Sequence, residues 1–158
     1  MPEAYIDVML QSLKKKEQIL EQIISLDDRQ KKQLEDSRCT ADEFDATVEE
    51  KAGLIEQLEQ LDDGFEKMYE RMKGELQENR TAYADQIQEM QELIRSITDK
   101  SVQIQAQEAR NKDLMVQKFA RVKRQAKEIR SNNKATTEYY RSMSQVNYID
   151  PQFMDNKK

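Results

Sequence analysis

The stretch FDATVEEKAGLIEQLEQLDDGFEKMYERM, residues 44–72, decides the fold class of this chain. Mostly apolar residues recur in it at alternating intervals of four and three, and the same spacing continues to Ile104. A period of 3.5 residues keeps one face of a helix against a partner helix along its whole length. The sequence therefore predicts an all-α protein with a seam made of Phe44, Val48, Lys51, Ile55, Leu58, Asp62, Phe65, Tyr69, Met72, Leu76, Asn79, Tyr83, Gln86, Met90, Leu93, Ile97, Lys100 and Ile104.

An earlier helix precedes this seam. Apolar residues at helical spacing predict it from about Tyr5 to Asp36. Thr40, followed three residues later by Glu43, then forms the pattern of a capping box, in which a hydroxyl and a carboxylate satisfy free backbone donors. A second helix is expected to begin there.

The second helix is predicted to turn between residues 74 and 81, where Gly74, Asn79 and Thr81 weaken the helical pattern. One uninterrupted helix from residue 41 to residue 133 would be roughly 140 Å long, and the first helix could cover only about a third of it. We therefore expect an elongated antiparallel three-helix bundle or coiled coil, with a long third helix from about residue 81 to residue 133 and a C-terminal tail.

The third helix is expected to extend about 30 Å past the connection between the first two. A second apolar row falls on this overhang, and large apolar side chains left in water forgo about 1.5–3 kcal/mol each. The row is therefore predicted to bind another protein, and it consists of Met115, Phe119, Val122, Ala126 and Ile129. A basic flank that begins at Lys118 accompanies the row, but almost no aromatic residues are interleaved with it, so we expect charge pairing across helices and no nucleic-acid binding.

The last twenty residues are expected to form a separate tail, residues 139–158, after a helical domain of residues 1–138. The tail holds four of the ten aromatic residues, and Asp150-Pro151 opposes continued helix. It is predicted to fold back on the bundle or to dock on another protein through Tyr139, Tyr140, Met143, Tyr148 and Phe153.

Composition narrows the function classes. Apolar residues make up 37% of the chain and charged residues 36%, with a net charge of -5. The absence of histidine removes the commonest general base and transition-metal ligand, and a single cysteine cannot form an intramolecular disulfide. No secretory signal and no apolar run long enough to span a membrane is evident. We therefore expect a cytoplasmic protein that is not an enzyme, needs no cofactor or metal and does not insert into membranes.

Two segments resemble a known family. They are LQSLKKKEQILEQIISLDDRQKKQLED, residues 10–36, and EEKAGLIEQLEQLDDGFEKMYERM, residues 49–72. Both are similar to the flagellar export chaperones of the FlgN type and, less closely, of the FliT type, and the ending YYRSMSQVNYIDPQFMDNKK is similar to the tails of members from Gram-positive flagellated bacteria. The matching positions are Leu20, Ile24, Gln30, Leu34, Lys51, Leu54, Ile55, Leu58 and Leu61.

The resemblance implies a cytosolic chaperone of the flagellar type III secretion system. Such proteins bind the C-terminal helical ends of late export substrates and deliver them to the membrane export gate, with no nucleotide or metal. FlgN-like members bind the hook-filament junction proteins, and FliT-like members bind the filament cap protein. On this interpretation the apolar row pairs with an amphipathic helix of the substrate, and the tail contacts the substrate or the export gate.

Other functions are also compatible with the sequence. A self-associating structural coiled-coil protein would pair its apolar rows with further copies and form a stable oligomer, whereas a chaperone would be largely monomeric or a weak homodimer. A third hypothesis is a regulator that binds a transcription factor through the same surface, as FliT-like proteins do.

Overall fold

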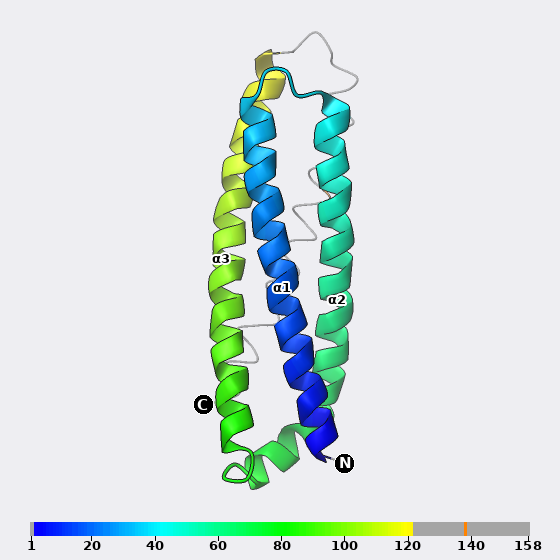
Figure 1. Cartoon of the computed structure of the whole chain (residues 1–158), viewed down its shortest axis with the longest axis vertical. Coiled ribbons are helices and arrows are strands. Elements are labelled where there is room, and N and C mark those ends of the chain that lie inside the picture. The colour runs from blue at the N-terminus through cyan, green and yellow to red at the C-terminus, as the bar shows by residue number, and fades with distance from the viewer. Residues whose placement is uncertain (1, 122–137, 139–158) are drawn as a thin grey trace.

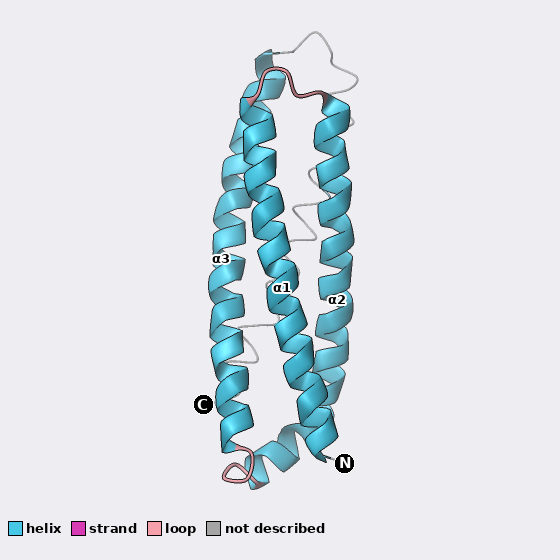
Figure 2. Cartoon of the chain, in the orientation of Figure 1, coloured by secondary structure: helices cyan, strands magenta, loops and turns pink. Residues whose placement is uncertain are grey.

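The computed structural model describes residues 2–121 and residue 138, and the three helices within this part run antiparallel to their neighbours in sequence. Helix α1 spans Pro2–Glu35, α2 spans Ala41–Glu78 and α3 spans Ala84–Arg121. Figure 1 shows the three helices side by side along the long axis of the molecule. In Figure 2 only helices and two short connections occur in the described residues, which confirms the predicted all-α bundle.

Helix α1 is the helix that holds the other two together. It packs closely against both α3 and α2, whereas the backbones of α2 and α3 approach each other at few points. Figure 1 shows α1 between its two partners at the front of the bundle. Because it faces two neighbours, α1 buries a wide apolar stripe, which includes Ile6, Met9, Leu10, Leu13, Ile19, Leu20, Ile23 and Leu26.

The predicted seam describes α2 well. Its members Phe44, Ile55, Leu58, Phe65, Met72 and Leu76 are buried, and so are the two charged members, Lys51 and Asp62. In α3 the predicted register is only partly right: Met90, Ile97 and Ile104 are buried as expected, but Ile94 and Ser101 take the intervening core positions predicted for Leu93 and Lys100. The seam cannot continue unchanged because the chain reverses between the two helices.

The boundaries between helices follow from local chemistry. The Thr40 side chain accepts a hydrogen bond from the Glu43 backbone N–H at 3.2 Å, so Thr40 caps α2 as predicted. At the other end of α2 the Asn79 N–H donates to the Glu75 carbonyl at 3.0 Å. The predicted turn is confirmed, but it lies a few residues later, after Glu78, because Gly74 remains within the helix.

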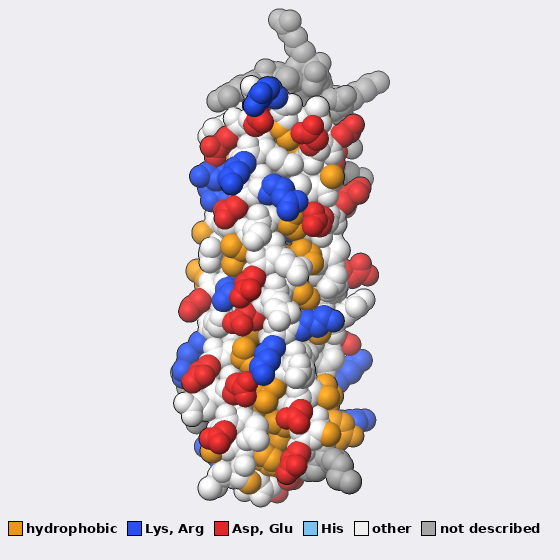
Figure 3. All heavy atoms as spheres, viewed as in Figure 1, with side chains coloured by type: hydrophobic (Ala, Val, Ile, Leu, Met, Phe, Trp, Pro, Cys, Tyr) orange, Lys and Arg blue, Asp and Glu red, His pale blue; other side chains and the backbone are white. Residues whose placement is uncertain are grey.

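The expected extension of the third helix to residue 133 falls outside the described residues, and so does the boundary between a helical domain and a tail. On the face of the molecule shown in Figure 3, acidic and basic side chains are interspersed along the bundle. Such mixing leaves no large field of one sign on this face.

Candidate functional site

The end of the bundle where α1 connects to α2 contains a small apolar cluster, which we call the connection cluster. Leu34 of α1, Phe44 of α2 and Met115 of α3 are its buried members. Three partly buried side chains pack against them, namely Val48, Leu114 and Phe119. Figure 1 places the last described turns of α3 beside the α1–α2 connection. All three helices therefore contribute to this end of the bundle.

Lys118 of α3 fixes the connection itself. Its ammonium group donates hydrogen bonds to the backbone carbonyls of Gln33 at 3.2 Å, Asp36 at 3.2 Å and Cys39 at 3.4 Å. The last carbonyls of a helix lack partners within the helix and carry the negative end of its dipole. A cation from α3 thus caps the C-terminal end of α1.

Carboxylates lie on and beside this connection. Asp36 accepts a hydrogen bond from the Arg38 backbone N–H at 2.9 Å, and this bond, aided by the charges of Arg38 and Lys118, lowers the pKa of Asp36. Across the first turns of α2, burial and the neighbouring carboxylates of Asp42 and Glu49 raise the pKa of Asp45. Lys118 thus lies near the Asp36 carboxylate, and further carboxylates crowd one another in the first turns of α2.

This arrangement corrects the expectation that Met115 and Phe119 lie on an overhang that the chain cannot cover. Met115 is 3% exposed, and Phe119 is partly buried against the connection cluster. The overhang was placed wrongly because α1 and α2 contain 34 and 38 residues, more than the approximately thirty expected. Met115 follows the start of α3 by 31 residues and Leu34 follows the start of α1 by 32, so the two lie at the same height. The other predicted contact residues lie outside the described residues. They are Val122, Ala126 and Ile129 of the substrate-binding row, and Tyr139, Tyr140, Met143, Tyr148 and Phe153 of the tail, predicted to contact the substrate or the export gate.

A layer of buried polar side chains separates the connection cluster from the main core, and we call it the polar layer. Its centre is Lys51 of α2, whose three ammonium protons reach Asp27 Oδ1 at 2.6 Å, Gln30 Oε1 at 2.5 Å and Glu108 Oε1 at 2.7 Å. Asp27 and Gln30 belong to α1 and Glu108 to α3, so one cation joins all three helices. The layer also includes Thr47, Gln107 and Asn111.

Neighbouring hydrogen bonds complete this layer. Gln30 Nε2 donates to Thr47 Oγ1 at 3.2 Å, and Asn111 Nδ2 donates to the Asp27 backbone carbonyl at 3.0 Å. Gln107 Nε2 donates to the Ile24 carbonyl at 3.2 Å. Buried polar groups are costly unless they are hydrogen-bonded, so these bonds fix the helices at one relative height.

Asp27 carries the strongest electrostatic perturbation at this site. The pKa of Asp27 is raised from 3.8 to about 8, mainly by burial; the nearby Lys51 ammonium opposes the shift and the Glu108 carboxyl adds to it. Two carboxyl groups in one buried site cannot both ionise easily. At neutral pH Asp27 is therefore largely protonated.

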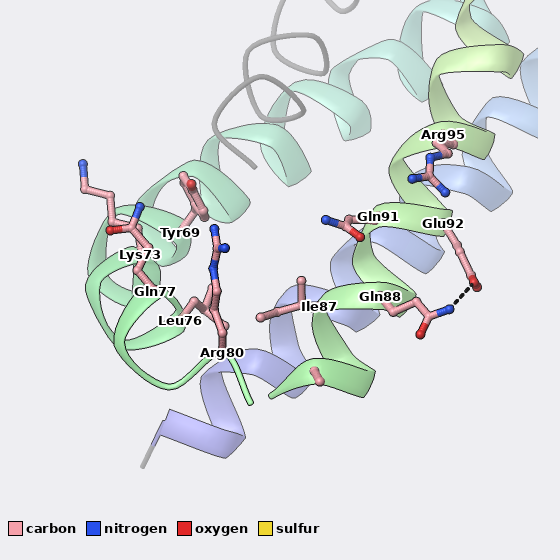
Figure 4. Close-up of a pocket in the computed structure, with 11 residues that line it drawn as sticks. Tyr69, Lys73, Leu76, Gln77, Arg80, Ile87, Gln88, Gln91, Glu92 and Arg95 are labelled. Carbon is pink, nitrogen blue, oxygen red and sulfur yellow. Dashed lines mark hydrogen bonds between the residues drawn. The ribbon is translucent and has the colours of Figure 1, made fainter. Parts of the chain in front are cut away.

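A shallow groove lies at the opposite end of the bundle, where α2 turns into α3. It has a volume of about 460 Å³ and is lined by Tyr69, Lys73, Leu76, Gln77, Arg80, Ala84, Ile87, Gln88, Gln91, Glu92 and Arg95. Figure 4 shows Ile87 of α3 pointing toward Leu76 of α2, with Arg80 of the turn above them. Glu92 accepts a hydrogen bond from Gln88 Nε2 at 3.4 Å (Figure 4). Neither Met115 nor Phe119, the described residues predicted to bind the substrate, lies here.

The sequence matches the FlgN protein family over residues 1–147, which is almost the whole chain. The chain belongs to the FlgN family. FlgN proteins are flagellar export chaperones, so flagellum biogenesis and protein export are the processes in which this chain acts. No curated protein and no solved structure matches the chain significantly.

Family membership agrees with the resemblance found in the sequence. The structure shows where the positions that carry this resemblance lie. Leu20, Leu34 and Leu58 are buried in the bundle, and Gln30 and Lys51 belong to the polar layer. In this FlgN-family chain the matched positions are therefore mainly core residues, which define the bundle more directly than they define a binding surface.

Within residues 2–121, no group of three or more His, Cys, Asp or Glu side chains is arranged to hold a metal ion. No helix in the same part of the chain is both long and apolar enough to cross a bilayer.

The polar layer is the feature of this FlgN-family structure that the sequence analysis missed. Lys51 and Asp62 were included in the seam although charged residues rarely occupy such positions unpaired. A second buried pair, between Lys16 of α1 and Asp62 of α2 at 2.8 Å, explains the other exception. A charged residue at a seam position was thus the available signal for a buried ion pair.

Proposed function

We propose that this chain is a cytoplasmic chaperone that binds the C-terminal helical ends of hook-filament junction proteins and delivers them to the flagellar export gate. The observation that carries this proposal is the match to the FlgN family over residues 1–147. The helical bundle supports it, because an apolar face of a helix can pair with an amphipathic helix of a partner.

The binding surface that we propose is the apolar row that begins in the connection cluster. Met115 and Phe119 are its base, and their packing against Leu34 and Phe44 holds the end of α3 in place. Val122, Ala126 and Ile129 continue the spacing of three and four residues and would supply the contacts to the substrate helix. Met115 thus contributes by anchoring the row.

The tail would supply a second contact, to the substrate or to the export gate. Its aromatic side chains, Tyr139, Tyr140, Tyr148 and Phe153, and Met143 are the residue types that dominate binding energy at protein interfaces. Two separate contacts on one chain would allow the substrate to be held while the gate is engaged.

Capture of the partner tests this function. Tagged full-length protein and a version that ends at Asn133 are expressed in the native flagellated host, and the proteins that co-purify are identified. We expect a hook-filament junction protein with the full-length chain. Recovery of the filament cap protein would assign the FliT-like role, and recovery of the chain alone would favour the structural coiled coil.

A matched pair of variants tests the proposed surface. Val122→Asp combined with Ala126→Asp is expected to abolish co-purification without changing helicity. Val116→Asp, on the exposed face of α3 where Val116 is 57% exposed, is expected to leave co-purification intact. Equal loss in both variants would show that the row is not the specific contact.

A further inference from the structure

The buried apolar side chains of the described residues form two clusters of very different size. The main cluster contains sixteen buried side chains, from Ile6 to Ile104, and the connection cluster contains three, Leu34, Phe44 and Met115. The polar layer around Lys51 lies between them. Since stability in a protein varies from one cooperative unit to the next, the end of α3 beyond this layer is a candidate for independent opening.

The polar layer makes opening less costly at this point than within the main core. Gln107 Oε1 is buried and accepts no hydrogen bond from the described residues. Asn111 Nδ2 and Lys118 Nζ donate to backbone carbonyls of α1 and of the connection. Water can replace these partners when α3 moves away, whereas it cannot compensate for exposing a cluster of large apolar side chains.

The surface beneath the end of α3 has a defined chemistry. Leu34, Phe44 and Val48 present an apolar strip along the α1–α2 hairpin. The carbonyls of Gln33 and Asp36 lie beside it and are satisfied by a cation from α3. The end of α3 shows which helix fits: large apolar residues four positions apart, Met115 and Phe119, with a lysine at 118 between them.

We propose that residues 111–121 of α3 detach from the hairpin as a unit, and that a basic amphipathic helix of the export substrate takes their place on Leu34, Phe44 and Val48. The choice of this occupant rests on the proposed chaperone function. The selectivity comes from charge: residues 31–45 contain five acidic and three basic side chains, and this net negative charge together with the C-terminal end of α1 favours a cationic helix over an acidic one. The detached end of α3 then exposes Met115 and Phe119.

Opening is tested by thiol labelling in a Cys39→Ser background. Met115→Cys and Ile97→Cys place a thiol at two positions of α3 that are 3% and 0% exposed. We expect the thiol at position 115 to react at least about tenfold faster, and its rate to change little with urea at concentrations that accelerate labelling at position 97. Equal rates with equal urea dependence would show that α3 opens only with global unfolding and would overturn the proposal.

Amide hydrogen exchange on the unmodified chain tests the opening of α3 without a core substitution. Amides of residues 111–121 are expected to exchange faster than those of residues 94–104 and by a process insensitive to urea. Uniform protection along both segments would overturn the proposal even if a cysteine variant failed to fold.

Occupancy is tested by adding the C-terminal segment of a junction protein and of its charge-reversed variant, in which Lys and Arg are replaced by Glu. If the substrate helix displaces the end of α3, the unmodified segment will accelerate labelling at position 115 and the charge-reversed segment will not. Binding that slows or does not alter labelling would overturn displacement. If neither segment binds, the proposed function and this occupant both fail, while the labelling ratio still decides whether α3 opens.

Discussion

Lys51 of α2 donates a hydrogen bond of 2.7 Å to Glu108 of α3, although the backbones of these two helices approach each other at few points. Both side chains are buried, and the same ammonium group bonds to Asp27 of α1 at 2.6 Å. A single cation therefore joins all three helices at one relative height. A buried polar group that specifies register is a known use of such pairs in coiled coils.

Removal of this cation is expected to destabilise the bundle strongly. Lys51→Ala leaves Asp27 and Glu108 buried together without a cation, and the loss of one member of a buried pair costs about 3–5 kcal/mol. The free energy of unfolding, measured by urea titration of the circular dichroism signal, reports this cost. A loss below about 1 kcal/mol would contradict it.

Replacing all three charged residues, Asp27, Lys51 and Glu108, by apolar ones should not destabilise the bundle. The triple variant Asp27→Leu, Lys51→Met, Glu108→Leu removes all three charges and is expected to be at least as stable as the parent, because no charge is then left unpaired. If register depends on the cation, this variant will also lose specificity, seen as more than one oligomeric species by sedimentation. A single species would show that the apolar seam alone sets the register.

The stability of the bundle is expected to fall as pH rises. The pKa of Asp27 is about 8 in the folded chain and near 3.8 in the unfolded chain. Between pH 3.8 and pH 8 the folded chain therefore holds a proton that the unfolded chain has released. The contribution of this proton to the free energy of unfolding is fully present below about pH 4. It is lost as pH rises toward 8, by up to about 1.4 kcal/mol per pH unit. Urea titrations at pH 5, 6, 7 and 8 measure this slope.

Matched variants isolate the group responsible. Asp27→Asn carries no titrating proton and is expected to flatten the pH dependence. Asp63→Asn alters an exposed carboxylate that pairs with Lys67, and it is expected to leave the slope unchanged. An unchanged slope in Asp27→Asn would assign the proton to another group.

Much of this fold could be predicted from the sequence because it depends on local chemistry. The 3.5-residue spacing gave the buried face of α2, and the Thr40–Glu43 pair gave the start of that helix. The register in α3 was predicted one residue away at alternate positions, since a reversal of the chain starts a new seam that local spacing does not reveal.

The candidate site was harder to predict for a related reason. Whether Met115 is core or surface depends on whether Leu34 and Phe44 lie at its height, and a few residues' error in helix length moves that height by a whole turn. The partners of Lys51 could not be chosen either, because the sequence offers many carboxylates and only the relative heights of the helices select Asp27 and Glu108.

A glycine in the middle of α2 is expected to be replaceable with a gain in stability. Gly64 lies on the exposed side of the helix, and a Cβ atom added there meets no atom within 4 Å. Gly64→Ala should therefore raise the free energy of unfolding by about 1 kcal/mol through its higher helix propensity. Gly53→Ala, equally unobstructed, serves as a replicate, and a loss of stability in both would point to a contact of this face with another part of the chain.

The contrast between two adjacent residues of α3 connects stability with function. Met115 is buried between Leu34 and Phe44, whereas Val116 beside it is exposed. Met115→Ala is expected to cost about 2–5 kcal/mol if the connection cluster unfolds together with the main core. If the end of α3 opens independently, only the difference between the closed and open states is lost, and global stability will fall by less than this while amide exchange of residues 116–121 accelerates. Val116→Ala should change stability by no more than about 0.5 kcal/mol and leave this exchange unaffected. Urea titration and hydrogen exchange on both variants therefore distinguish a rigid anchor from an end that opens for its partner.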